Sequence, residues 1–137
     1  MSPYVSESIR RLVRERAQDR CEYCGMTQAI QGATFHIEHI VPRRKGGKDE
    51  ADNLALACPS CNLHKSDHIE SKDPEMGEIV PLFHPRRDEC EEHFGSEDLR
   101  IIGITPVGRA TVALLNLNSE RRLLIRGIEQ ALGLHLA

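Results

Sequence analysis

The spacing of apolar residues along the first half of the chain predicts short helices and short strands. Apolar positions three and four residues apart indicate a helix over residues 6–18, with arginines on its opposite face. Residues 34–40 and 53–57 are typical of short extended segments, separated by a polar loop with two glycines. Pro59 favours the first turn of a helix that continues to about Lys65. The predicted order is therefore helix, strand, strand, helix.

The second half has weaker signals of the same kind. Residues 66–79 are polar and contain Pro74 and Gly77, which indicates a linker or a surface loop. After this segment we expect a short extended piece and a short acidic helix within 79–94, a strand at 99–105 and a turn at 106–108. Residues 109–116 fit a helix or a strand, with helix favoured, and residues 119–132 predict a final helix. This mixture predicts an α+β protein, and a length of 137 residues suggests one domain.

The distribution of charged residues along the chain is more informative than the net charge. The formal net charge of −3 does not indicate a nucleic-acid-binding protein. The basic residues nevertheless gather in three groups, and a near-neutral total can conceal a basic face that meets phosphate. The groups are Arg10, Arg11, Arg14 and Arg16; Arg43, Arg44, Lys45 and Lys48; and Arg86 and Arg87.

The chain has no apolar run near the roughly 18 residues that suggest a membrane span, and its first residues do not resemble a secretory signal. We therefore expect a cytoplasmic protein with no membrane partner. In a reducing compartment, five cysteines favour metal binding or free thiols over disulfides.

Four of the cysteines form two pairs with the spacing of metal ligands. Cys21 and Cys24 make one CxxC pair, and Cys58 and Cys61 make another. Two such pairs can surround one tetrahedral zinc ion, which leaves no open position for a substrate. Ordinary buried cysteines are the alternative, but two CxxC pairs among five cysteines are rarely a coincidence. The sequence thus predicts a structural Zn²⁺ site. Any catalytic residues must then lie elsewhere in the chain.

The segment between the two pairs carries side chains suited to phosphodiester hydrolysis. His39 can act as a general base near neutral pH, and Asn53 can hold its ring in one orientation. Glu38 and Asn62 offer oxygen ligands to a divalent cation, which neutralises charge on a phosphate. The basic loop at 43–48 can hold the nucleic-acid backbone, although a solvated surface loop is the alternative.

These landmarks resemble, in order, those of the HNH endonucleases, in the zinc-bearing branch of the ββα-metal nucleases. The matching residues are Glu38-His39-Ile-Val-Pro, Gly46-Gly47, Asp52-Asn53-Leu54 and Cys58-x-x-Cys61-Asn62-x-x-Lys65. The resemblance covers roughly residues 21–65. It implies a small ββα core stapled by zinc. The apolar pattern outside the resemblance adds an N-terminal helix before this core and a C-terminal strand and helix extension after it.

The resemblance also implies roles for individual residues. His39 would be the general base, Asn53 would hold the loop and the histidine ring, and Glu38 with Asn62 would hold one Mg²⁺ or Mn²⁺ ion. The family usually has Asp where this chain has Glu38. In addition, strict alternation along a strand would aim Glu38 and His39 at opposite faces, so the strand should end or twist here.

We therefore predict a metal-dependent endonuclease that hydrolyses DNA, with RNA left open as a substrate. The alternatives are a zinc-ribbon module that binds nucleic acid without cleavage and a nuclease subunit of a larger complex. We expect one domain over 1–137, divided into a helix (1–20), an HNH core (21–68) and an α/β extension (69–137). Residues 99–137 are a candidate surface for a homodimer or a partner subunit. The expected nucleic-acid contacts are Arg43, Arg44, Lys45, Lys48, Lys65, Arg86 and Arg87.

Overall fold

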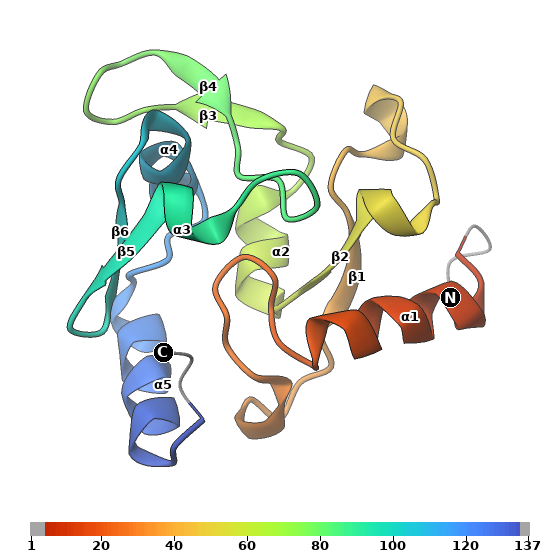
Figure 1. Cartoon of the computed structure of the whole chain (residues 1–137), viewed down its shortest axis with the longest axis horizontal. Coiled ribbons are helices and arrows are strands. Elements are labelled where there is room, and N and C mark those ends of the chain that lie inside the picture. The colour runs from red at the N-terminus through yellow and green to blue at the C-terminus, as the bar shows by residue number, and fades with distance from the viewer. Residues whose placement is uncertain (1–4, 135–137) are drawn as a thin grey trace.

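The computed structural model describes residues 5–134 and shows a mixed α+β architecture (Figure 1). Its strands form three separate antiparallel pairs, β1 with β2, β3 with β4, and β5 with β6. Helix α2 lies between the β1–β2 pair on one side and the elements that follow β4 on the other (Figure 1). The predicted fold class is therefore confirmed.

Helix α1 (Glu7–Ala17) forms the N-terminal element, as predicted for residues 6–18. It begins where the Ser6 hydroxyl accepts a hydrogen bond from the backbone N–H of Ile9 at 3.3 Å, which satisfies one of the free amides of the first turn. It ends at Gln18, whose left-handed backbone (φ 55°) stops the helix. Val13 is fully buried on the face that meets β2.

The next elements form a ββα unit. Strand β1 (His36–His39) pairs antiparallel with β2 (Leu54–Ala57), with His39 opposite Leu54. Two short 3-10 turns, η2 (Arg43–Lys45) and η3 (Ala51–Asn53), lie in the connection between these strands, and a third, η1 (Gln28–Ile30), precedes β1. Helix α2 (Pro59–Lys65) follows with the predicted bounds and contacts both strands.

The loop between β1 and β2 depends on a glycine at its return. A Cβ atom at Gly47 would lie 1.7 Å from the backbone oxygen of Val41, so a side chain cannot fit without moving the backbone. This close approach brings the two ends of the basic loop together. The loop is therefore held at a defined distance from the end of β1.

The predicted loop over 66–79 is wrong in part, because it contains a hairpin. Strands β3 (Glu70–Lys72) and β4 (Ile79–Pro81) pair antiparallel across it. The buried carboxylate of Asp73 accepts hydrogen bonds from the Arg109 guanidinium at 3.0 and 2.8 Å and from the backbone N–H of Glu75. A polar residue can be buried here because a distant arginine satisfies it.

The remaining elements are α3 (Cys90–His93), β5 (Phe94–Glu97), β6 (Arg100–Gly103), α4 (Pro106–Leu114) and α5 (Glu120–Ala131). The strand near 99–105 and the final helix were predicted, whereas β5 was not. The turn predicted at 106–108 is wrong, because α4 begins at Pro106. Proline fits the first helical position, and the Thr105 hydroxyl caps the helix by accepting from the Gly108 N–H at 3.0 Å.

One cluster of buried apolar side chains joins the two halves. It includes Val13 of α1, all of β2, the four paired cysteines, Phe83, Leu115 and Leu117. The sheet that carries β1 is thus packed against both the N-terminal helix and residues of the C-terminal extension. None of the helices between residues 5 and 134 has the length and apolar character that a membrane crossing needs.

Candidate functional site

The four paired cysteines come together in the interior. Their Sγ atoms all lie within 4.8 Å of one another, and the Cys24 and Cys58 sulfurs are 3.8 Å apart. All four side chains are buried. This arrangement suits tetrahedral coordination by thiolates at about 2.3 Å from one zinc ion. The donor set therefore fits the structural zinc that the spacing predicts.

Two tight turns produce this geometry. In the first, the backbone N–H of Gly25 donates to the Cys21 oxygen at 2.8 Å, and Gly25 adopts a positive φ of 77°. In the second, Cys58 caps α2, and its sulfur accepts a hydrogen bond from the backbone N–H of Cys61 at 3.4 Å. Each turn aims its two sulfurs at the same point, which is why the CxxC spacing predicts the site well.

The ionisation of these thiols also favours a bound cation. Burial raises the pKa values of Cys21 and Cys61, whereas hydrogen bonds from neighbouring thiols lower those of Cys24 and Cys58. Four such groups cannot all become thiolates in one buried cluster without a positive charge between them. A divalent metal supplies that charge, and the Arg122 side chain on α5 adds another, 2.8 Å from the Cys61 sulfur.

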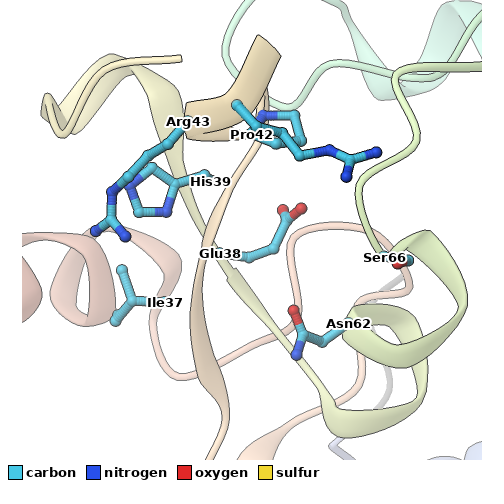
Figure 2. Close-up of a pocket in the computed structure, with 8 residues that line it drawn as sticks. Ile37, Glu38, His39, Pro42, Arg43, Asn62 and Ser66 are labelled. Atoms are coloured by element: carbon cyan, nitrogen blue, oxygen red, sulfur yellow. The ribbon is translucent and has the colours of Figure 1, made fainter. Parts of the chain in front are cut away.

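A pocket of about 370 Å³ opens beside the end of β1 (Figure 2). It brings together the predicted base, two oxygen ligands and two arginines of the basic loop. The residues that line it are Ile37, Glu38, His39, Pro42, Arg43, Arg44, Asn62 and Ser66. The other predicted site residues, including Asn53 and Lys65, do not line this pocket.

His39 has a partner that the sequence did not reveal. Its Nε2 lies 2.7 Å from Oδ1 of Asp49, and the same carboxylate oxygen accepts a hydrogen bond from Nε of Arg43 at 2.8 Å. The Arg43 guanidinium, followed by the His39 ring, holds the pKa of Asp49 below its usual value. The carboxylate is therefore charged at neutral pH and fixes the histidine ring. An acid ten residues away in a polar loop gives no sign of this contact in the sequence.

Asn53 holds the loop, as expected. The expected contact of Asn53 with the imidazole is replaced by the contact between His39 and Asp49. The carboxamide oxygen accepts from the backbone N–H of Val41 at 2.9 Å, and the amide nitrogen donates to the oxygens of Val41 and Lys48 at 3.0 and 2.9 Å. These bonds satisfy backbone groups that the reversal of the chain would leave unpaired. Both N–H groups of the side chain are thus used by backbone oxygens, and the hydrogen-bond partner of the His39 ring is Asp49 instead.

Glu38 is buried in a polar cluster under the pocket. Its Oε1 accepts a hydrogen bond from the Tyr23 hydroxyl at 2.7 Å, and its Oε2 lies 2.7 Å from Nζ of Lys65. Nζ itself donates to the backbone oxygen of Ile40 at 2.8 Å. Burial raises the pKa of Glu38, and the nearby ammonium and hydroxyl oppose that rise only in part. The acid next to the proposed base is therefore held by two side chains.

The expectation that Lys65 contacts nucleic acid is wrong. Its side chain is 2% exposed, because α2 turns it inward to the Glu38 carboxylate and to the end of β1. Arg86 also differs from its prediction. Its guanidinium forms an ion pair with Glu22, which joins the segment after β4 to the turn after α1. The Arg86 side chain is only 18% exposed. Arg87 is exposed, as a phosphate contact would require.

Glu38 and His39 follow strand alternation. β1 ends at His39, yet the two side chains still diverge. Figure 2 shows the His39 ring on one side of the strand with Arg43, and the Glu38 carboxylate on the other side, toward Asn62. They border the same pocket from its two sides. The strand thus ends at this point, as expected, but its end does not bring the two side chains to one face.

The basic loop is exposed but internally paired. Arg44 forms an ion pair with Asp67, and Nζ of Lys45 donates to the Asp67 backbone oxygen at 2.8 Å. Exposed ion pairs typically contribute about 0–1 kcal/mol to stability, so Arg44 can leave the Asp67 carboxylate at little cost. Lys48 is exposed in the same loop. The loop therefore presents positive charge at the mouth of the pocket.

The pocket also has donors suited to a divalent cation. Oε2 of Glu38 is buried and, among the described residues, has an ion pair but no aligned hydrogen-bond donor. Figure 2 shows the carboxamide oxygen of Asn62 turned toward this carboxylate. Hard oxygen donors of this kind are those that Mg²⁺ and Mn²⁺ prefer. The residues present therefore fit such an ion, with Lys65 as a competing positive charge.

Comparison with protein families adds one finding. Residues 21–68 match the family described as HNH endonuclease. Comparison with curated proteins and with solved structures gives no match. The matched segment contains both cysteine pairs, the β1–β2 hairpin with its basic loop, and α2. The sequence landmarks, the ββα unit and the metal-binding cluster therefore coincide within the segment that is similar to the HNH endonuclease family.

Proposed function

We propose that this protein is a metal-dependent endonuclease that hydrolyses DNA phosphodiester bonds, with His39 as the general base. The observation that carries the proposal is the contact between His39 and Asp49, at the edge of a pocket that also contains a carboxylate and two arginines. A protein that only binds nucleic acid does not need an oriented imidazole there. RNA remains an alternative substrate with the same backbone chemistry.

The Asp49 contact supports different roles for the two ring nitrogens of His39. A charged carboxylate accepts a hydrogen bond, so Nε2 carries the proton that it shares with Asp49. Nδ1 then has a free lone pair and takes the proton from the attacking water. After this transfer the imidazolium is stabilised by the neighbouring carboxylate. Asp49 acts through the histidine and is therefore a positioning residue.

Other side chains bind the substrate and the ion. Arg43, Arg44 and Lys48 lie where they can contact phosphate oxygens on either side of the scissile bond. Glu38 and Asn62 would hold a Mg²⁺ or Mn²⁺ ion on the opposite side of β1. Such an ion, when bound, neutralises charge on the phosphate and on the leaving oxygen. His39 then needs only to activate the water.

The C-terminal extension supports a further part of this proposal, a surface for a homodimer or partner subunit within 99–137. Helix α5 exposes Leu124 and Ile128, and its C-cap residue Leu132 is exposed four residues further on. A row of exposed apolar side chains is more typical of a contact surface than of a solvated helix. Pairing would also give a nuclease with one site per chain access to both strands.

Plasmid nicking tests the function. The zinc-loaded full chain should convert supercoiled plasmid to nicked or linear forms when Mg²⁺ or Mn²⁺ is present, and not in buffer without added divalent ions. His39→Ala should reduce the rate by about 10²–10⁴-fold with its zinc content unchanged, because a general base contributes that much. His68→Ala, in the exposed segment after α2, is the control and should cut at the parental rate.

Two results would contradict the proposal in different ways. Cleavage by His39→Ala at the parental rate would show that another group activates the water. Binding of the parent to DNA without cleavage in any divalent ion would favour the zinc-ribbon binding module.

A further inference from the structure

Helix α5 places a buried arginine against the cysteine cluster, although it lies outside the segment that matches the HNH family. Nη2 of Arg122 lies 2.8 Å from the sulfur of Cys61 and 3.6 Å from that of Cys58. Nη1 donates to the backbone oxygen of Leu115 at 2.8 Å and to the Ser60 hydroxyl at 3.2 Å. The residue is only 2% exposed, so its charge is removed from water.

The negative charge of a four-thiolate zinc site explains why a buried arginine would contact its sulfurs. Four thiolates exceed the charge of one divalent ion by two, and a buried net charge is costly unless it is compensated. A guanidinium that donates to two of the sulfurs compensates part of this excess. It also reduces electron density on the ligands and fixes their direction, as outer hydrogen bonds do in other metal sites.

A neighbouring arginine shows that a buried arginine on α5 does not necessarily contact the cysteine sulfurs. Arg126 is also buried, one turn later on the same helix. Its guanidinium donates to the backbone oxygens of Leu99 and Leu117 at 2.8 and 2.6 Å, and to Oδ1 of Asn118 at 3.4 Å. These contacts tie α5 to the preceding segments. The contact with the metal ligands thus belongs to Arg122.

We propose that Arg122 is a positioning residue of the zinc site. Its guanidinium holds the metal-bound thiolates of Cys61 and Cys58, so that α5 and the HNH domain bind zinc as one unit. The inference depends on zinc at the cysteine cluster and is independent of the nuclease activity. Because coupling between two parts is reciprocal, zinc should stabilise α5 as much as α5 strengthens the binding of zinc.

Metal affinity of the full chain tests this inference. Competition with a chromogenic chelator should show about 10–100-fold weaker zinc binding by Arg122→Gln, which is the usual effect of losing an outer partner of a ligand. Arg121→Gln, at the adjacent exposed position, should bind zinc like the parent. Arg126→Gln controls for burial: it should lower the melting temperature but leave the affinity of the folded protein within about threefold of the parent.

Cobalt substitution separates the hydrogen bond from general stability. The thiolate-to-cobalt charge-transfer band of Arg122→Gln should move to lower energy, because loss of the donor raises the energy of the sulfur lone pairs. Arg126→Gln should leave that band in place. A parental band together with a zinc affinity within about twofold of the parent in Arg122→Gln would overturn the inference.

Arg122→Lys keeps the test decisive if Arg122→Gln does not fold. Lysine preserves the charge but not the planar fork that reaches two sulfurs and the Leu115 oxygen together. We expect zinc binding roughly fivefold to tenfold weaker than that of the parent and a band shifted in the same direction. An Arg122→Lys protein with parental affinity and a parental band would show that Arg122 supports only the backbone.

Discussion

The cysteine cluster and the pocket beside β1 both concentrate polar groups, but they do so in opposite ways. In the cluster, four donor atoms from two turns lie within 4.8 Å of one another and are closed off from water. In the pocket, the His39 ring and the Glu38 carboxylate lie on different sides of one strand, and each already has a partner in the chain (Figure 2).

We interpret this difference as that between a structural metal site and the proposed catalytic site. A metal ion in the cluster would link β2, α2 and the turn after α1, because the four cysteines come from these segments. The arginines beside the pocket form exposed ion pairs, which typically contribute only about 0–1 kcal/mol to stability. Its buried carboxylate is balanced by Lys65, so the region is stable before any ion or substrate arrives.

The largest effect should come from the cluster. Cys58→Ser removes one thiolate, and structural zinc contributes about 10–16 kcal/mol in zinc-finger peptides, which exceeds the whole stability of many domains. We expect loss of bound zinc, loss of cooperative unfolding in circular dichroism and loss of cleavage. The exposed Cys90 is the matched control, and Cys90→Ser should keep all three. A Cys58→Ser protein with the melting temperature of the parent would show that metal binding at the cluster does not stabilise the fold.

A smaller effect should come from the buried pair under the pocket. Lys65→Met leaves the Glu38 carboxylate buried with only the Tyr23 hydroxyl as a partner. Removing one member of a buried ion pair costs about 3–5 kcal/mol, so urea denaturation should show a loss of that size. The double variant Glu38→Gln with Lys65→Met should recover most of it, because no charge is then left unpaired.

The same variants test whether Glu38 can hold a divalent ion. In Lys65→Met the competing ammonium is absent, and Mn²⁺ should raise the melting temperature. In the double variant the carboxylate is also absent, and Mn²⁺ should have no such effect. Equal shifts of the melting temperature in the two proteins would show that Glu38 does not bind the ion. Separately, a Lys65→Met protein as stable as the parent in urea would show that the buried pair does not contribute to stability.

The parts of the molecule that the sequence predicts well depend on neighbouring residues. The two CxxC turns, the cap and apolar face of α1, and the start of α2 at Pro59 are each determined within a few positions. The HNH landmarks then place these elements in the right order. Local chemistry therefore predicts the metal cluster and the ββα unit.

The errors come from partners that are distant in the chain. Asp73 can sit in a buried turn of the β3–β4 hairpin only because Arg109 reaches it. The same is true of Arg86, which pairs with Glu22, and of Lys65, which α2 turns inward to Glu38. A sequence pattern shows that these residues are polar and charged, but it does not show which of them satisfy one another inside.

The most delicate test concerns the ring of His39. Asp49→Asn keeps an oxygen near Nε2 but removes the charge that orients the ring and stabilises the imidazolium. A hydrogen bond to a charged group contributes about 1.5–3 kcal/mol, so single-turnover cleavage should slow by about 10–100-fold, with zinc content and melting temperature close to the parental values. Asp52→Asn, an exposed acid of the same loop that does not line the pocket, should cut normally. If Asp49→Asn cleaves as fast as the parent, the imidazole is positioned by something other than this carboxylate.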